Sequence, residues 1–286
     1  MKASRPSRTA HFVALGRAMA NAGLSHVAGF SDPTARVFLN DKGKQALAKI
    51  ELALKHGKET ARMRMARTMG DLIGLRTVAI DKAVRDAIAA GATQLVILGA
   101  GYDGRAWRLQ ELKGLKVFEV DHPATQSEKR ARVEQLSPPI GSVSFVSVDF
   151  ERDSIATVLD RAGHEPSVPT CWIWEGVVMY LTHDAMIATL NAVAKRSARG
   201  STLIVNYHTA HRRWFARLIF RLIGEPQISA WTPEEMAADL RSAGFAVRED
   251  SGMEDWNTRF AAGKARVDRA RYMRIAVATI DRSRAG

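Results

Sequence analysis

The spacing of apolar residues divides the chain into two parts. Between residues 10 and 90, apolar side chains recur every three to four positions, which is the spacing of one face of a helix. Leu47, Ile50 and Leu54 form one such series, and the segment 63–73 contains a second. This part of the sequence predicts helices and no strand.

From Gln94 onward, short apolar runs alternate with helical stretches. Most of these runs end in glycine or an acidic residue, which is typical of repeated strand–helix–strand units in a parallel sheet. We expect strands at 94–99, 115–121, 142–150, 170–176, 201–207, 245–250 and 272–279, and helices near 124–136, 152–161 and 184–197. The last two strands are expected to form an antiparallel pair at the edge of the sheet.

Two further helices are expected after the fifth strand. Thr232 is a suitable N-cap, Pro233 suits the first helical position and Glu235 completes a capping box, so a helix should begin there and end near Gly244. Before it, the stretch 211–223 places apolar and arginine side chains on different faces of a helix. This stretch is either a lid helix packed on the core or a basic surface that meets an acidic or lipid-like substrate.

The domain organisation that follows is a helical cap on an α/β sheet domain. We place the N-terminal cap or lid at residues 1–90 and a Rossmann-like domain at 91–286, with a helical insertion at about 208–230. The 286 residues are 46% hydrophobic, which is enough to fill a sizeable core.

Charge and cysteine content restrict the classes of protein. The net charge is +12, but the basic residues are spread along the chain and do not alternate with aromatic residues, so no specific nucleic-acid partner is expected. The single cysteine, Cys171, excludes an internal disulfide and a multi-cysteine metal site, and no metal is expected. No apolar run is long enough for a signal peptide or a transmembrane helix, so a cytoplasmic protein is expected.

A glycine-rich loop follows the first predicted strand. Gly99, Gly101 and Gly104 form a G-x-G-x-x-G pattern, and Asp121 ends the next strand. In a dinucleotide-binding domain, such glycines approach a pyrophosphate and the acid binds ribose hydroxyls, which predicts an NAD(P)-dependent oxidoreductase. The negative charge of Asp103 inside the loop disfavours a pyrophosphate. It favours S-adenosylmethionine, which has no phosphate but has the same ribose diol.

The motifs around this loop resemble the leucine carboxyl methyltransferase family, which includes bacterial relatives that O-methylate polyketides. They are Arg76-Thr77 followed by Asp81, VILGAGYDGRAWRL at 96–109, FEVDHP at 118–123 with Lys129, VDF at 148–150, EGVVMYL at 175–181 and the run 231–245. The resemblance implies a class I methyltransferase fold, with a doubly wound, mostly parallel seven-stranded sheet that includes an antiparallel edge strand. The sequence departs from this pattern at Val78, where a polar or bulky side chain is expected.

The resemblance also implies a set of residues that bind S-adenosylmethionine. These are Arg76 for the methionine carboxylate, Gly99 against the methionine portion, Asp121 for the ribose hydroxyls, Asp149 and Phe150 for the adenine, and Glu175 near the amino group. The glycine-loop pattern itself adds Gly101 and Asp103 as expected cofactor contacts. Other interpretations stay open: Asp149 also suits a helix N-cap, Glu175 a solvated strand end, and Asp103 a local ion pair with Arg105.

The acceptor of the methyl group is expected to be a carboxyl or hydroxyl group of a small molecule. A carboxylate needs no general base, whereas a hydroxyl group does, and His183, His208 and His211 each lie shortly after a strand end. We expect His208 or Tyr207 to act on the acceptor side, although a histidine in such a place is often a hydrogen-bonded loop residue. The sequence thus predicts an S-adenosylmethionine-dependent O-methyltransferase, monomeric or homodimeric. The alternatives are the oxidoreductase and, on net charge alone, an RNA methyltransferase.

Overall fold

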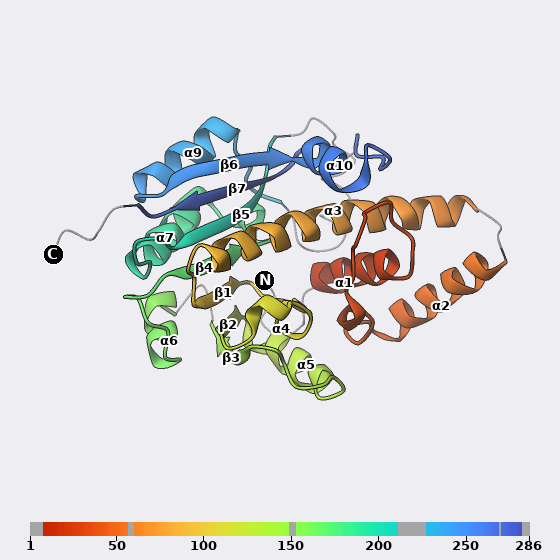
Figure 1. The fold of residues 1–286 in the computed structure, drawn as a ribbon, viewed down its shortest axis with the longest axis horizontal. Helices are drawn as coiled ribbons and strands as arrows, with labels where there is room; N and C mark the ends of the chain where they lie inside the picture. Colours follow the sequence, from red (N-terminus) through yellow and green to blue (C-terminus); the bar gives the residue numbers. More distant parts are fainter. Residues whose placement is uncertain (1–7, 57–59, 149–152, 211–226, 269, 282–286) are drawn as a thin grey trace.

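A seven-stranded sheet forms the centre of the computed structural model, which describes residues 8–56, 60–148, 153–210, 227–268 and 270–281. The strand order is β3-β2-β1-β4-β5-β7-β6 (Figure 1). The strands are β1 (Gln94–Leu98), β2 (Lys116–Asp121), β3 (Ser142–Ser147), β4 (Thr170–Trp174), β5 (Thr202–His208), β6 (Ala246–Gly252) and β7 (Met273–Thr279). All seven predicted strands are confirmed to within three residues.

The sheet is parallel except for one strand. β1 to β5 run parallel to one another, whereas β7 is antiparallel to both β5 and β6. The expected antiparallel pair at the edge is therefore present. The strand that runs against the others, β7, lies one place inside the edge, and β6 is the edge strand itself.

Helices cover both faces of the sheet and form the cap. They are α1 (Arg8–Asn21), α2 (Asp41–Lys55), α3 (Ala61–Ala89), α4 (Arg105–Arg108), α5 (Pro123–Val133), α6 (Ile155–Arg161), α7 (His183–Lys195), α9 (Pro233–Ser242) and α10 (Met253–Ala261), with short 3-10 turns η1 (Pro33–Arg36), η2 (Gln110–Leu112) and η3 (Val178–Tyr180). The predicted capping box of α9 is present, with Pro233 in its first turn. The sequence analysis did not predict α10.

Successive strand residues point to opposite faces, and this separates the core into two layers. On one face, Leu95 and Ile97 of β1 pack against α3, α4 and α10. On the other, Val96 and Leu98 pack with two buried tryptophans, Trp172 and Trp174, against α6, α7 and α9. The helices on both faces explain why the inner strands are apolar along their whole length.

The N-terminal cap consists of α1, α2 and the first half of α3, which lie beside the sheet in Figure 1. Its own core includes Phe38, Leu47 and Ile50. α3 also contributes Leu75, Ile80 and Val84 to the core of the sheet, so one 29-residue helix joins the cap to the sheet domain. Within the described ranges, no helix is both long and apolar enough to cross a membrane.

Candidate cofactor site

The glycine loop follows β1 at the point where the strand order reverses, between β2 on one side and β4 on the other. In doubly wound sheets this switch point is where ligands bind. Gly99 and Gly101 both adopt positive φ angles, of 68° and 49°, which side chains other than glycine rarely adopt. A Cβ atom on Gly99 would lie only 2.3 Å from Cγ2 of Val177. Position 99 therefore requires glycine for two reasons: its positive φ angle, and the lack of space for a Cβ atom beside Val177.

Asp121 lies opposite this loop, at the end of β2. One carboxylate oxygen accepts a hydrogen bond from the Gly101 amide, and the other accepts from the His122 amide at 2.6 Å. Burial raises the pKa of Asp121, and the two amides act against that shift. Each carboxylate oxygen can accept a further hydrogen bond, so Asp121 is suited to hold a diol.

Asp103 and Arg105 form the ion pair that the sequence analysis considered as an alternative. Asp103 accepts hydrogen bonds from the Arg105 amide at 2.7 Å and from its guanidinium. Burial disfavours the charge on Asp103, but the cations around it, led by Arg105, hold its pKa at about 2. Both oxygens of Asp103 are thus engaged by Arg105 within the protein.

Arg76 and Glu175 form an ion pair beside the same loop, although Arg76 comes from α3 and Glu175 follows the end of β4. Arg76 Nε lies 2.8 Å from Glu175 Oε1, and Arg105 Nη1 lies 2.9 Å from Oε2. Burial opposes the charge of Glu175, but Arg76 and Arg105 lower its pKa overall, so it is an anion at neutral pH. The structure therefore brings together a buried cation and a partly buried anion beside the glycine loop.

These contacts belong to a larger group of charged side chains, which we call the buried ion network. It comprises four arginines and four acids: Arg17, Asp32, Arg76, Asp81, Asp103, Arg105, Arg108 and Glu175. The network is electrically balanced and extends from α1 to the end of β4. Asp81 belongs to a sequence motif that gives it no role, and nothing in the sequence signals the pairing of Arg17, Asp32 or Arg108, because their partners are distant in the chain.

The two predicted acceptor-side residues lie on opposite faces of β5. The ring of His208 packs edge-on against Tyr272 at 4.7 Å. Burial raises the pKa of Tyr272, and the positive charge of nearby Arg76 acts against that shift. Tyr207 faces the other way, and its hydroxyl group donates to Asp250 at 2.6 Å. The structure thus brings His208, but not the Tyr207 hydroxyl, to the side of Arg76.

The other candidates are separate from this cluster or outside the described residues. His183 is exposed at the start of α7, where its ring lies 3.0 Å from Asp239. Asp149, Phe150, His211 and the whole 211–223 stretch lie outside the described residues.

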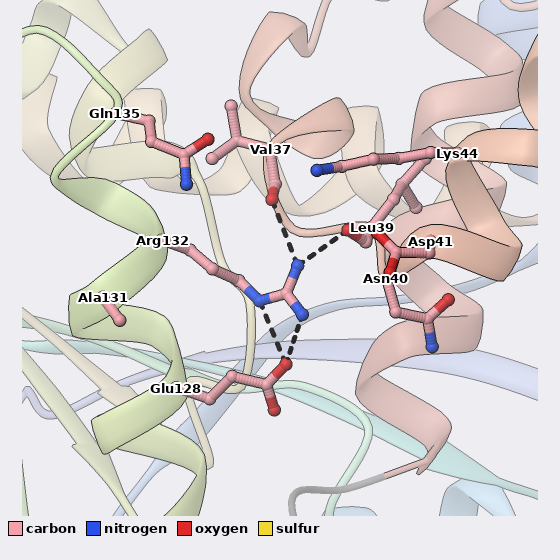
Figure 2. A pocket seen from close by; sticks show the side chains of 9 residues that line it. All are labelled: Val37, Leu39, Asn40, Asp41, Lys44, Glu128, Ala131, Arg132 and Gln135. Atoms are coloured by element: carbon pink, nitrogen blue, oxygen red, sulfur yellow. Dashed lines mark hydrogen bonds and ion pairs between the residues drawn. The ribbon is translucent and has the colours of Figure 1, made fainter.

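A surface groove of about 340 Å³ lies away from these residues, between the cap and α5 (Figure 2). Arg132 crosses it and donates to the carbonyl groups of Val37 at 3.3 Å and Leu39 at 2.7 Å, and to Glu128 at 3.0 Å. Because these contacts occupy the guanidinium, the groove is a junction between the cap and α5, and it contains none of the predicted site residues.

Fold and site together define a class I S-adenosylmethionine-dependent methyltransferase. The sheet order and the glycine loop at the switch point are those of this fold. The strand-end acid suits the cofactor's ribose diol, and the paired charges of Arg76 and Glu175 suit its amino-acid group. Comparison with known proteins gives the family: the leucine carboxyl methyltransferase pattern matches residues 10–194. The chain belongs to this family.

Individual relatives agree with this assignment. A protein of Mycolicibacterium gilvum, provisionally named an S-adenosyl-L-methionine-dependent methyltransferase, is 36% identical over 71% of this chain and 67% of its own length. A protein with the same provisional name from Mycolicibacterium smegmatis is 34% identical over 72% and 67%. These names favour the methyltransferase over the oxidoreductase.

Solved structures show the same fold. A DUF574 family protein from Streptomyces avermitilis has a TM-score of 0.61 at 14% identity, over 96% of this chain and 97% of its own. The magnesium protoporphyrin IX methyltransferase of Synechocystis, solved with bound S-adenosylhomocysteine, has a TM-score of 0.51 at 15% identity, over 85% and 96%.

Proposed function

We propose that this enzyme transfers the methyl group of S-adenosylmethionine to an oxygen atom of a small carboxylic or hydroxylic acceptor. The observation that carries the cofactor assignment is the largely buried Arg76–Glu175 pair beside a glycine loop whose Gly101 amide donates to Asp121. Oxygen as the acceptor atom is supported by the family, whose name specifies carboxyl methylation.

The amino-acid end of the cofactor carries one carboxylate and one ammonium group. Arg76 offers a guanidinium fork for the carboxylate, and Glu175 offers an anion for the ammonium. In the structure these two side chains neutralise each other at 2.8 Å. We propose that binding exchanges this internal pair for two pairs with the cofactor, while Arg105 keeps hold of Glu175.

The remaining cofactor contacts follow from the loop and the strand end. Asp121 would accept from the ribose hydroxyls while the Gly101 amide orients it. Gly99, whose positive φ angle and close approach to Val177 shape the loop, would lie against the methionine portion. Asp149 and Phe150 stay predicted adenine contacts.

S-adenosylmethionine supplies a methyl group activated by its sulfonium. Transfer would break the bond from carbon to sulfur as the bond from carbon to the acceptor oxygen forms, which would release S-adenosylhomocysteine and give a methyl ester or a methyl ether. The protein's task is to hold the oxygen in line and to exclude water. A hydroxyl acceptor must also lose a proton, and His208 is the group we assign to receive it. Tyr207, held by Asp250 on the other face, is assigned to the packing of β5.

An acceptor screen with methyl-labelled cofactor tests this proposal. Base releases the label as methanol from a methyl ester but leaves an ether intact, so mild alkali separates the two acceptor classes. His208→Gln should lower kcat strongly for a hydroxyl acceptor and little for a carboxylate, with Tyr207→Phe as the matched control from the same strand. Label recovered only on nitrogen or carbon would exclude O-methylation.

A further inference from the structure

A buried ion pair lies behind the ribose-binding position and has no role in the function proposed so far. Glu119 is two residues before Asp121 on β2, so both side chains point to the same face of the sheet. Lys129 of α5 places its ammonium 2.5 Å from Glu119 Oε2, and each side chain is only 1% exposed. Removing both charges from water carries a large desolvation penalty, so local packing alone is a weak reason for this pair.

The surroundings of Lys129 hold its ammonium in place. It lies 5.7 Å from the ring centre of Phe38 in the cap and 5.6 Å from that of Trp107 after the glycine loop. Phe38 in turn stacks on Tyr102 of the glycine loop at 5.4 Å. The Lys129 side chain is therefore fixed by the cap, the loop and the sheet together.

The charge of Lys129 reaches the proposed cofactor site. Among the described residues, no lysine, arginine or histidine forms an ion pair with Asp121 within 4 Å, and burial raises the pKa of Asp121. After the two backbone amides, Lys129 is the largest influence that favours the ionised form. Burial also raises the pKa of Glu119 to about 7, so Glu119 only partly offsets the lysine at neutral pH.

We propose that Lys129 is a positioning residue of the cofactor site, whose fixed ammonium keeps the Asp121 carboxylate ionised and ready to accept the ribose diol. This inference rests on the ribose-binding role proposed for Asp121. The acceptor site is not involved.

Other titratable groups around Asp121 define what the test must separate. Glu119 and His122 come from β2 and its end, and Tyr102 and Asp103 come from the glycine loop. Asp103 is itself held ionised in part by Lys129. The variant Asp121→Asn, which cannot ionise at this position, therefore shows whether the pH dependence of binding comes from Asp121.

The test measures the dissociation constant of S-adenosylhomocysteine between pH 5 and pH 8 by isothermal titration. Wild-type affinity should fall as the pH drops through the pKa of Asp121. Lys129→Met should move the midpoint of this loss to higher pH, so that this variant binds S-adenosylhomocysteine more weakly than wild type near the wild-type midpoint. Glu119→Gln, which leaves the lysine uncompensated, should leave the midpoint unchanged or lower it.

An upward midpoint in Lys129→Met that Glu119→Gln does not share would distinguish a charge effect from damage to packing, which would lower the melting temperature of both variants without moving the midpoint. Lys116→Met, at the exposed start of the same strand, is the matched control. If Lys129→Met does not fold, the neutral double variant Glu119→Gln/Lys129→Met replaces it and should also show an upward shift of the midpoint, because Glu119 offsets the lysine only in part.

Three results would be decisive. Wild-type protein that does not bind S-adenosylhomocysteine overturns the proposed function. Normal wild-type binding with an unmoved midpoint in the lysine variant overturns only the role of Lys129. A pH dependence that persists in Asp121→Asn also overturns it, because the titrating group would then be another residue.

Discussion

Gly99→Ala should distort the cofactor loop for two separable reasons. An alanine at φ 68° costs about 1–2 kcal/mol in backbone strain alone. Its Cβ would also lie 2.3 Å from Cγ2 of Val177, more than 1 Å inside the ordinary carbon contact distance of about 3.5–4.0 Å. Relieving such an overlap costs a further ~1–3 kcal/mol. The two effects sum to about 2–5 kcal/mol.

The structure provides a control for each reason. Gly163→Ala, at φ 83° with nothing within 4 Å of the new Cβ, isolates the backbone strain. Gly99→Ala combined with Val177→Ala removes the clashing methyl group and leaves only Cβ of residue 177, at the ordinary distance of 3.6 Å. The double variant should therefore recover part of the stability that the single variant loses.

Thermal unfolding and titration with S-adenosylhomocysteine measure the outcome. At about 2–4 °C per kcal/mol for a chain of this size, Gly99→Ala should melt about 4–20 °C lower than wild type and Gly163→Ala only about 2–8 °C lower. Cofactor affinity should fall in Gly99→Ala and stay unchanged in Gly163→Ala. Equal effects of the two substitutions on both measurements, without rescue by Val177→Ala, would refute the close approach at Gly99.

Other side chains give further predictions. Arg105→Met leaves three buried carboxylates short of a cation and should lower the free energy of urea unfolding by about 3–5 kcal/mol; a loss under about 1 kcal/mol would contradict this. Burial and Arg196 lower the pKa of His164 to about 4, so the unfolded chain binds the extra proton first as the pH falls. Stability should therefore decline from about pH 6.5 to pH 4, and unfolding of His164→Gln should show a flatter pH profile. Tyr207→Phe breaks the Asp250 hydrogen bond and should cost about 1–2 kcal/mol in denaturation while leaving methyl transfer intact; a large loss of kcat would restore Tyr207 as an acceptor-side group.

The sequence predicted the sheet well because its signals are local. Each inner strand is a short apolar run, and turns or caps such as Thr232 with Glu235 mark where helices begin. α10 was missed, although Met253, Trp256 and Phe260 recur at helical spacing there. Because strands were predicted on both sides of it, the segment 251–271 was interpreted only as the connection between them.

The candidate site was predictable only in part, for a physical reason. The loop glycines and Asp121 stand in one continuous motif, and the structure brings them together as expected. The buried ion network depends on partners such as Arg17 and Asp32 that meet only after the cap folds onto the sheet. Nor does residue order show that Arg76 and Glu175 neutralise each other.

The most direct test of the central claim is isothermal titration of S-adenosylmethionine, S-adenosylhomocysteine and NADH into the purified protein and into Asp121→Ala. Asp86→Ala, an exposed acid on α3, is the matched control. The account predicts micromolar binding of both adenosyl compounds to wild type and to the control, a loss of at least about tenfold in Asp121→Ala, and no binding of NADH. Binding of NADH alone, or adenosyl binding that Asp121→Ala leaves unchanged, would contradict it.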